Sequence, residues 1–595
     1  MDSRRPPLAP AFRSLPEYVR HWAETTPDRR AFTFVDHPAP HSRGVHRTLT
    51  WRRLDLRMRA VAARLTAEAE PGARVAVLCP QGTEYVVGFL GALAAGLVAV
   101  PLFPPGLPGQ GDRLTAVLAD ADPAVVVTTG ASLAGVRELC EGRAVRVLAV
   151  DQVPDAAADD LLGPALPAGR PSASDGTAVA YLQYTSGSTR TPAGVEITHA
   201  NVVANARQAL SAYGADTRQV TCVGWLPLYH DMGLVLSVAA PVVRGLLSVL
   251  MDPVAFLHEP VRWLRLLAAH PRALSAAPNF AYDYCASTVT EAQKAGLRLD
   301  GVWALINGSE PVRPGTADRF HAAFAAQGLV PETHCPSYGL AEATVFVSAA
   351  RPGQPLRGFA LDRDALATGK ALPARPDDPR AVLLAGCGAP AGQRVRVADP
   401  VSNVALAEGE IGEIWVQGPN VGRGYRNQVR QTRRVFGAVL ADATADRQDG
   451  SPGAWLRTGD LGTVLDGQLI VTGRLKDLIV VDGRNHYPQD VEATVQDAHP
   501  AVRRDRLAAF GVPGGSGERV VVVAEHPRTV PVADIDVPAL VRTVRAAVSA
   551  RHGLRLSDVV LVPPGTVPRT SSGKVSRALT RERYTAGAYA VEGLG

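Results

Sequence analysis

The chain has 595 residues, more than a single hydrophobic core usually supports, so at least two packed domains are expected. Hydrophobic residues make up 46% of it, as in a globular enzyme, and a net charge of +5 without blocks of like charge gives no indication of nucleic-acid binding. The six cysteines are scattered without a CxxC pair, which argues against a zinc site and a disulfide framework and favours the reducing cytoplasm.

The first apolar segment raises the question of a membrane span. Residues 1–10 carry charge and proline without an apolar core, so no signal peptide is expected. The stretch from Tyr85 to Phe103 is just long enough to cross a bilayer, but glycines interrupt it and Pro101 breaks it. We therefore predict a buried helix followed by a buried strand, and no transmembrane segment.

Further elements alternate in type along the first two thirds of the chain. A stretch of helical period, 54–67, is followed by short apolar runs at 74–80, 124–129 and 178–184. This alternation predicts an α/β fold with largely buried strands. The segment from Arg351 to Arg380 is rich in Pro, Gly and Arg and is predicted to be an irregular insertion.

In the last third of the chain the pattern of expected elements changes. Residues 411–472 indicate turn-separated strands, with Asp466-Gly467 as a strong hairpin signal. A smaller α+β unit is predicted after Lys476. Its expected elements are helices at 489–498 and 538–551 and strands at 520–524 and 559–562. We therefore divide the chain into residues 1–475 and 476–595, called the large and the small domain below.

The first chemical motif is a loop rich in hydroxyls and glycines that follows the run 178–184. Its glycines let backbone N–H groups converge on an anion, and its hydroxyls donate further hydrogen bonds to phosphate oxygens. No Gly-Lys-Ser/Thr closes it, so it is not a Walker loop, and taken alone it would be better explained as a solvent-exposed loop. The candidate phosphate-binding residues are Thr185, Ser186, Gly187, Ser188 and Thr189.

This loop resembles the phosphate-binding signature of the acyl-AMP-forming superfamily, which includes acyl-CoA synthetases, luciferases and peptide-synthetase adenylation domains. Many members have Gly and Lys where this chain has Arg190 and Ala193, and the string TSGSTRTPAGV is closely similar to that of fatty acyl-AMP ligases. Further signatures follow in the expected order. The resemblance implies a large N-terminal domain of mixed α/β subdomains with a strand-rich region, and a small, mobile α+β C-terminal domain.

The segment 224–234 resembles the family's junction between ATP and the acyl substrate. In it, His230 would orient phosphate or carboxylate oxygens, although a lone histidine is more often a core residue bonded to a carbonyl. No metal cluster around it is visible in the sequence.

Two later segments resemble those that enclose adenine in this family. In the second, Tyr338 would stack on the purine, while Glu342 would hold Mg²⁺, because a hard cation prefers carboxylate oxygen. Taken alone, Glu342 is better explained as a carboxylate at the start of a helix. The candidate adenine-binding residues are Ser309, Glu310, Pro311, Ser337, Tyr338 and Gly339.

The segments 455–460 and 473–477 resemble the family's ribose-binding and hinge motifs. An ionised Asp460 can accept hydrogen bonds from both ribose hydroxyls, and Arg474 would reinforce this contact. An isolated surface ion pair is the simpler alternative for both. Lys476 lies at the predicted domain boundary, where a hinge residue would absorb the backbone rotation.

The last motif, 568–577, resembles the family's catalytic-lysine loop. A carboxylate that attacks an anionic α-phosphate is repelled by it, and the ammonium of Lys574 would offset this repulsion. The chain contains only four lysines, so we give little weight to a solvated surface lysine at this position.

The resemblance implies that a long-chain fatty acid reacts with ATP, with Mg²⁺ as cofactor, to give acyl-AMP and pyrophosphate. The string TSGSTRTPAGV, the segment 481–490 and the insertion favour a fatty acyl-AMP ligase, in which the insertion is thought to restrain the small domain. The acyl group would then pass to the phosphopantetheine of a separate holo-acyl carrier protein. The alternatives are an acyl-CoA synthetase and a catalytically silent nucleotide-binding protein. An amino-acid adenylation domain fits less well, because no acidic segment matches the one that binds an α-ammonium.

Overall fold

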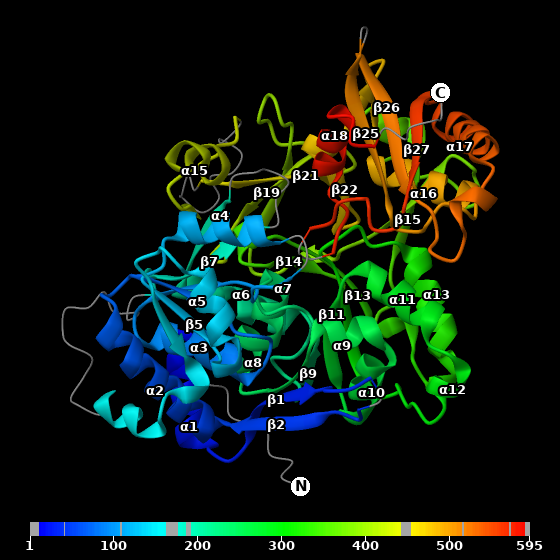
Figure 1. The fold of residues 1–595 in the computed structure, drawn as a ribbon. Helices are drawn as coiled ribbons and strands as arrows, with labels where there is room; N and C mark the ends of the chain where they lie inside the picture. The colour runs from blue at the N-terminus through cyan, green and yellow to red at the C-terminus, as the bar shows by residue number, and fades with distance from the viewer. Residues whose placement is uncertain are drawn as a thin grey trace.

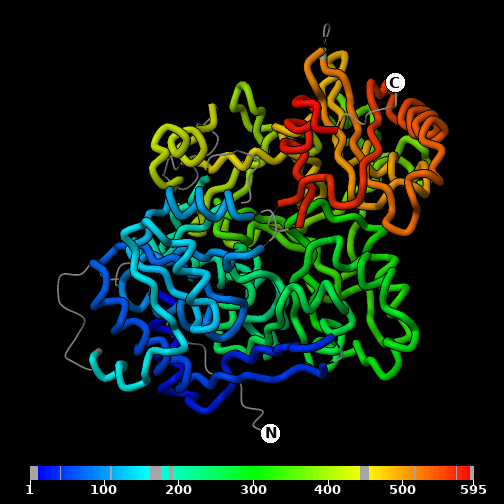
Figure 2. The backbone as a smooth tube through the Cα atoms, in the orientation of Figure 1, coloured from blue at the N-terminus to red at the C-terminus, as the bar shows by residue number. Residues whose placement is uncertain are grey.

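A computed structural model describes residues 11–40, 42–107, 110–161, 176–185, 192–441, 454–514, 517–570 and 573–589. In Figure 1 the blue, cyan and green elements of the large domain form the lower part of the molecule, and its yellow elements lie above them on the left. The orange and red elements of the small domain lie above the green elements on the right. Figure 2 shows the same arrangement in the backbone trace, with blue segments of the large domain at the bottom and red segments of the small domain near the top.

The largest sheet of the large domain has a parallel centre and antiparallel edges. The strands at its centre are mostly apolar and are buried on both faces, as expected where helices cover both faces of a sheet. In spatial order the strands are β17 (Ala389–Pro390), β14 (Phe346–Ala349), β13 (His334–Gly339), β12 (Val302–Asn307), β11 (Ala273–Ala277), β9 (Thr221–Gly224), β10 (Leu247–Met251), β1 (Arg30–Asp36) and β2 (Val45–Thr50).

The second sheet contains the three apolar runs predicted from the sequence, which are β3, β5 and β7. It is parallel except at β8 and β20, which pair antiparallel at one edge. Its spatial order is β20 (Gly424–Tyr425), β8 (Gly194–Thr198), β7 (Val179–Tyr184), β4 (Val98–Pro101), β3 (Arg74–Val77), β5 (Val125–Thr128) and β6 (Arg146–Ala149).

Helices pack against both sheets, and their ends follow local capping rules. The helix predicted at 54–67 begins earlier, because the Thr50 hydroxyl accepts the backbone N–H of Arg53 at 3.3 Å. The helices are α1 (Leu15–Thr25), α2 (Trp51–Glu68), α3 (Thr83–Ala94), α4 (Gly111–Ala121), α5 (Leu133–Leu139), α6 (His199–Ala212), α7 (Asp231–Leu234), α8 (Ala240–Arg244), α9 (Pro253–His258), α10 (Val261–Ala269), α11 (Asn279–Thr288), α12 (Glu291–Lys294) and α13 (Pro314–Phe324).

The apolar stretch 85–103 forms most of α3 and then β4, both buried, as predicted. In the part of the chain that the structure describes, no helix is long and apolar enough to cross a bilayer.

The strand-rich region contains the predicted hairpin. In it, β21 (Leu456–Leu465) pairs antiparallel with β22 (Gln468–Arg474), and Asp466 and Gly467 take the positive φ angles, 48° and 71°, that a tight turn needs. The sheet continues through β19 (Gly412–Gln417) to β18 (Arg394–Ala398). A helix, α15 (Val429–Phe436), interrupts the predicted series of strands.

The insertion is more regular than predicted. Its residues form β15 (Gly358–Asp362) and α14 (Arg363–Ala367), and β15 pairs with β16 (Ala381–Ala385). The prediction of an irregular segment was therefore wrong for its middle, where the apolar positions Phe359 and Leu361 pack in a buried cluster.

The small domain has a hydrophobic core of its own. Its main cluster is drawn from residues between Ile479 and Val559. The sheet β25 (Leu507–Gly514), β26 (Gly517–Glu525) and β27 (Leu556–Val562) packs with α16 (Pro488–Ala498), α17 (Val537–His552) and α18 (Arg577–Thr585), and β23 (Ile479–Val481) pairs with β24 (Arg484–His486). The predicted helices and strands of this domain are confirmed, whereas β25 was not predicted.

Candidate active site

A cleft of about 640 Å³ brings together side chains from distant parts of the chain, from both domains. Among the predicted site residues, it is lined by Thr185, His230, Ser309, Gly339, Glu342, Asp460, Arg474, Lys476 and Lys574.

The predicted ribose-binding pair lies at the end of the hairpin. Asp460 and Arg474 are directly opposite each other in the β21–β22 register, and Arg474 Nε donates to Asp460 Oδ1 at 3.1 Å. The other carboxylate oxygen accepts the hydroxyl of Tyr338 at 2.8 Å. Asp460 itself is buried. Two donors therefore fix the orientation of the carboxylate.

Tyr338 lies behind this carboxylate, at the end of β13. Its ring packs in a buried hydrophobic cluster with Val347 and Val416. Burial raises the pKa of the Tyr338 hydroxyl, and Asp460 raises it further, so the hydroxyl remains a donor.

Lys574 reaches the cleft from the small domain. Its loop is closed by two hydrogen bonds: Thr570 N–H donates to the Lys574 carbonyl at 2.8 Å, and Lys574 N–H donates to Thr570 Oγ1 at 3.2 Å. Burial lowers the pKa of the ammonium, and the charge of Arg474 lowers it further, against the opposing effect of carboxylates that include Asp231 and Asp460. Lys574 thus lies within electrostatic reach of the ribose pair.

His230 lies in the cleft beside a carboxylate that the sequence analysis did not single out. Its Nδ1 is 2.6 Å from Asp231 Oδ1, the same oxygen that accepts the backbone N–H of Met232 at 2.7 Å. Burial would raise the pKa of Asp231, but the charge and hydrogen bond of His230 and the charge of Lys574 hold it below its usual range. The pair orients the imidazole at the start of α7.

Glu342 points into the cleft from the segment after β13. Its Oε1 accepts the hydroxyl of Tyr425, from β20, at 2.7 Å. Burial raises the pKa of the Glu342 carboxyl. A nearby cation would therefore stabilise its ionised form.

The predicted adenine-binding residues divide into two groups. Ser309, with a φ of 70°, and Gly339 line the cleft. The carboxylate of Glu310 instead accepts the backbone N–H of Phe280 at 2.6 Å, at the first turn of α11. Pro311 is exposed, and Ser337 bonds to Tyr213 and to the carbonyl of Cys335, so neither is among the described residues that line the cleft.

Of the predicted phosphate loop, the structure describes Thr185, whose carbonyl accepts a hydrogen bond from Arg113 NH2 at 3.0 Å. The remaining predicted residues, Ser186, Gly187, Ser188 and Thr189, lie outside the described residues.

Sequence reasoning missed further residues that line the cleft, among them Asp231, Glu413, Arg457, Tyr425 and Arg434. Asp231 could have been found from its position next to His230. Glu413 is the buried partner of Arg457, whose NH2 is 2.7 Å from Glu413 Oε2, and this ion pair supports the turn before Asp460. Tyr425 and Arg434 come from β20 and α15, whose approach to the cleft is a consequence of the tertiary fold.

The insertion contacts the small domain directly. Arg363, the first residue of α14, donates from Nε to Asp490 Oδ2 at 3.1 Å and from NH1 to the carbonyl of Arg551 at 3.0 Å. The next residue, Asp364, accepts from Arg484 NH2 at 2.5 Å. These contacts attach the insertion to the start of α16, to β24 and to the C-terminal end of α17, where a cation is favoured.

Comparison with known proteins gives two family matches. A family model described as AMP-binding enzyme matches residues 19–426, and one described as Disco-interacting protein 2-like, AMP domain, matches residues 476–593. Long-chain-fatty-acid–AMP ligase FadD26 from Mycobacterium marinum is 42% identical over 584 residues, which cover 96% of this chain and 97% of that protein. Putative fatty-acid–CoA ligase FadD21 from Mycobacterium tuberculosis is 40% identical over 583 residues, covering 96% of this chain and 98% of that protein.

A solved structure shows a similar fold. The fatty acyl-adenylate ligase from Legionella pneumophila, in complex with acyl adenylate and pyrophosphate, superposes with a TM-score of 0.72 at 31% sequence identity and covers 97% of this chain and 96% of that one. By sequence and by fold, the chain belongs to the AMP-binding enzymes and, within them, to the fatty acyl-AMP ligases.

Proposed function

We propose that this protein activates a long-chain fatty acid with ATP, giving fatty acyl-AMP and pyrophosphate, and then transfers the acyl group to the phosphopantetheine thiol of a separate acyl carrier protein. The observation that carries the proposal is the entry of Lys574, from the small domain, into the cleft that also contains Asp460, Arg474 and His230. A protein that only bound nucleotide would not need this cation beside the ribose site.

The charges of the cleft suit the adenylation step. The fatty-acid carboxylate attacks the α-phosphorus of ATP, the bond to the β-phosphate oxygen breaks, and pyrophosphate leaves with the electron pair. Lys574 offsets the repulsion between the two anions, while Asp460, oriented by Tyr338 and Arg474, holds the ribose side of the nucleotide. His230, oriented by Asp231, donates to the phosphate or carboxylate oxygens. The predicted stacking of Tyr338 on adenine stays a prediction.

Glu342 is the residue that fits Mg²⁺ in this proposal. Within the described residues no group of three or more His, Cys, Asp or Glu side chains could hold a metal ion. Mg²⁺ often binds through one or two carboxylates together with substrate phosphates and water, so a single carboxylate in the cleft is compatible with it. When bound, the ion would neutralise phosphate charge. Burial raises the pKa of the Glu342 carboxyl, and a bound cation would lower it again.

The acceptor is proposed from the insertion. Arg363 and Asp364 attach it to the small domain. To rotate and expose the adenylate to a thiol, the small domain would have to break these contacts or move together with the insertion. A carrier protein can offset this cost with contacts of its own, whereas CoA has a smaller surface. The name of FadD21 makes CoA the second candidate acceptor.

The six cysteines are all buried and form no disulfide, which agrees with a proposed action in the cytoplasm.

Mass spectrometry of the products tests this function. The enzyme is incubated with ATP, Mg²⁺ and a panel of fatty acids, alone, with CoA, or with a holo-carrier protein, and the variant Lys574→Ala serves as the inactive control. We expect acyl-AMP in all arms with wild type, transfer to the carrier, and little acyl-CoA, with a loss of roughly 10²-fold or more in the variant. Efficient acyl-CoA formation by the wild type would favour a synthetase. Absence of acyl-AMP with every fatty acid would refute the activation step.

A further inference from the structure

One buried side chain fixes a loop beside the cleft at both of its ends. The loop, residues 308–313, connects β12 to α13 and contributes Ser309 to the cleft wall. Asn279 Oδ1, at the start of α11, accepts from Asn307 Nδ2 at 3.2 Å and from the backbone N–H of Arg313 at 3.1 Å. The backbone from which the Arg313 side chain extends is therefore held in place by the large domain.

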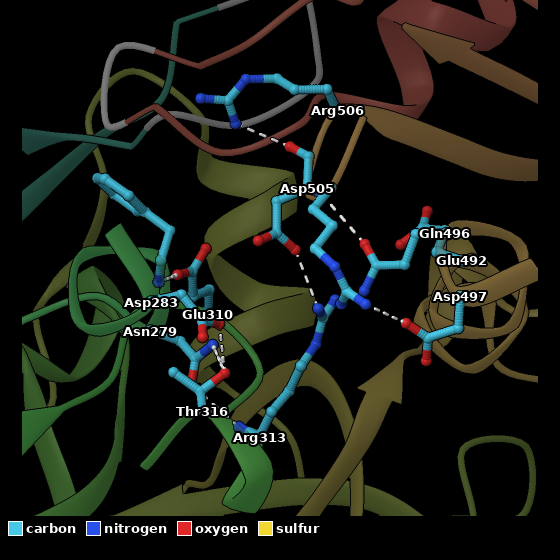
Figure 3. Close-up of polar contacts among 12 residues, drawn as sticks. Asn279, Asp283, Glu310, Arg313, Thr316, Glu492, Gln496, Asp497, Asp505 and Arg506 are labelled. Carbon is cyan, nitrogen blue, oxygen red and sulfur yellow. Dashed lines mark hydrogen bonds and ion pairs between the residues drawn. The ribbon is translucent and has the colours of Figure 1, made fainter. Parts of the chain in front are cut away.

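From this loop Arg313 reaches the small domain. Its NH1 donates to Asp505 Oδ1 at 2.9 Å (Figure 3). Asp505 lies in the turn between α16 and β25 with a φ of 55°, and it is fixed on its own side. Its N–H donates to Gln496 Oε1 at 3.2 Å, and its carbonyl accepts from Arg506 NH1 at 2.8 Å. The backbones that carry both side chains are held by other contacts, so forming the ion pair orders only the two side chains.

The position of this ion pair differs from that of the insertion contacts. The insertion holds the small domain at β24, at the start of α16 and at the end of α17, whereas Arg313 holds it at the turn before β25. The same 308–313 loop carries Glu310, whose charge acts on Lys574. A single loop therefore contacts the nucleotide cleft on one side and the small domain on the other.

We infer that Arg313 and Asp505 form an interdomain clasp that couples the nucleotide-side loop to the position of Lys574. The inference rests on the proposed function and names two positioning residues for its adenylation step. A nucleotide that contacts Ser309 when the loop is in its clasped position favours the closed clasp, and the closed clasp favours a bound nucleotide to the same degree. When the small domain turns toward a thiol, the pair separates.

Kinetics of the two half-reactions test the clasp. Arg313→Met keeps the aliphatic stem, and Asp505→Asn keeps a residue that tolerates the left-handed backbone. We expect each variant to lower the rate of pyrophosphate release about 2- to 5-fold, the range for a partly exposed ion pair, and the double variant to be no slower than either single one. The rate of acyl transfer from preformed acyl-AMP should stay unchanged or rise.

Arg298→Met is the matched control for these variants. It removes a more exposed pair, Arg298 with Asp300 at 3.4 Å, from the large domain alone, and we expect wild-type rates. Additive losses in the double variant, or equal slowing of both half-reactions, would overturn the clasp.

A second measurement does not depend on acyl chemistry. The six native cysteines are buried, so spin labels can be attached selectively at Ala322→Cys on α13 and Ala546→Cys on α17, both of which are exposed. With ATP alone, we expect a narrow distribution of label distances in the otherwise wild-type protein and a broad one when Arg313→Met is added. The same distribution in both proteins would refute the clasp, whereas absence of acyl-AMP in wild type would refute only the proposed function.

Discussion

At the scale of single residues, Lys574 enters the cleft with a pKa below that of an ordinary lysine, because burial and Arg474 both disfavour its charged form. If adenylation needs the ammonium, kcat/KM for pyrophosphate release must fall as the pH rises through this lowered pKa. The alkaline limb is therefore expected below the usual lysine value of about 10.4.

The variant Lys574→Arg checks this assignment. Arginine stays protonated over the accessible range, so the variant should be slower but should lose the alkaline limb. A pH profile of kcat/KM for both proteins is the measurement. The same alkaline limb in the variant would assign the titration to another group.

A second prediction at this scale concerns the hydrogen bond from Tyr338 to Asp460. Tyr338→Phe leaves the ring in its cluster and removes one of the two donors that orient the carboxylate. Because the ribose is held alike in the ground and transition states, ATP and acyl-AMP should both bind about 10-fold more weakly, with little change in kcat. Calorimetric titration of both ligands measures this.

The control is Tyr584→Phe, which removes a tyrosine–aspartate hydrogen bond of 2.7 Å to Asp558, far along the chain in the small domain. It should leave both affinities unchanged. Equal losses in the two variants would attribute the effect of Tyr338→Phe to general destabilisation.

At the scale of elements, the insertion is attached to the small domain mainly through α14. Arg363→Met removes the hydrogen bonds to Asp490 and to the carbonyl of Arg551 while keeping most of the side-chain volume. We expect the rate of acyl-CoA formation from CoA and preformed acyl-AMP to rise several-fold. The reason is that a smaller free-energy difference would separate the adenylating orientation of the small domain from the orientation that admits a thiol. Pyrophosphate release should change little.

Arg375→Met is the matched control within the same insertion. Arg375 pairs with Asp377 on the surface, where their side chains are 85% and 72% exposed, and makes no described contact with the small domain. It should not change acyl-CoA formation. A gain in both variants would indicate a general loosening of the insertion, and no gain in Arg363→Met would assign the exclusion of CoA to a different surface.

The sequence signals that succeeded at this scale were local. Asp466-Gly467 predicted a hairpin because few residue pairs adopt two successive positive φ angles, and the apolar runs 74–80 and 124–129 predicted strands buried on both faces. Contacts between distant segments left no such signal. The hydrogen bond from Tyr425 to Glu342 and the ion pair from Arg313 to Asp505 depend on how whole sheets pack, so the sequence predicted Glu342 but not its partner.

At the scale of the whole molecule, the small domain has its own hydrophobic core, so its stability can change without that of the large domain. Leu540 is 1% exposed in this core. Leu540→Ala should lower the free energy of unfolding of the small domain by about 2–5 kcal/mol. Differential scanning calorimetry should show an early transition that moves to lower temperature, while the transition of the large domain stays in place.

The rate of adenylation by Leu540→Ala should fall at temperatures near the lowered unfolding transition of the small domain, because Lys574 leaves the cleft when that domain unfolds. ATP binding to the large domain should persist there. A single transition that shifts as a whole would show that the two domains unfold together.

The hairpin has a consequence for the fate of the reactive intermediate. The β21–β22 register ends with Asp460 opposite Arg474, and the chain leaves the sheet directly afterwards, at Leu475–Asp477. A rotation that begins at Lys476 would therefore leave both proposed ribose-binding side chains where they are. In the proposed function, the acyl-adenylate, a mixed anhydride that water would destroy if it escaped, would stay bound through the whole movement, and only the face of the protein that closes over it would change.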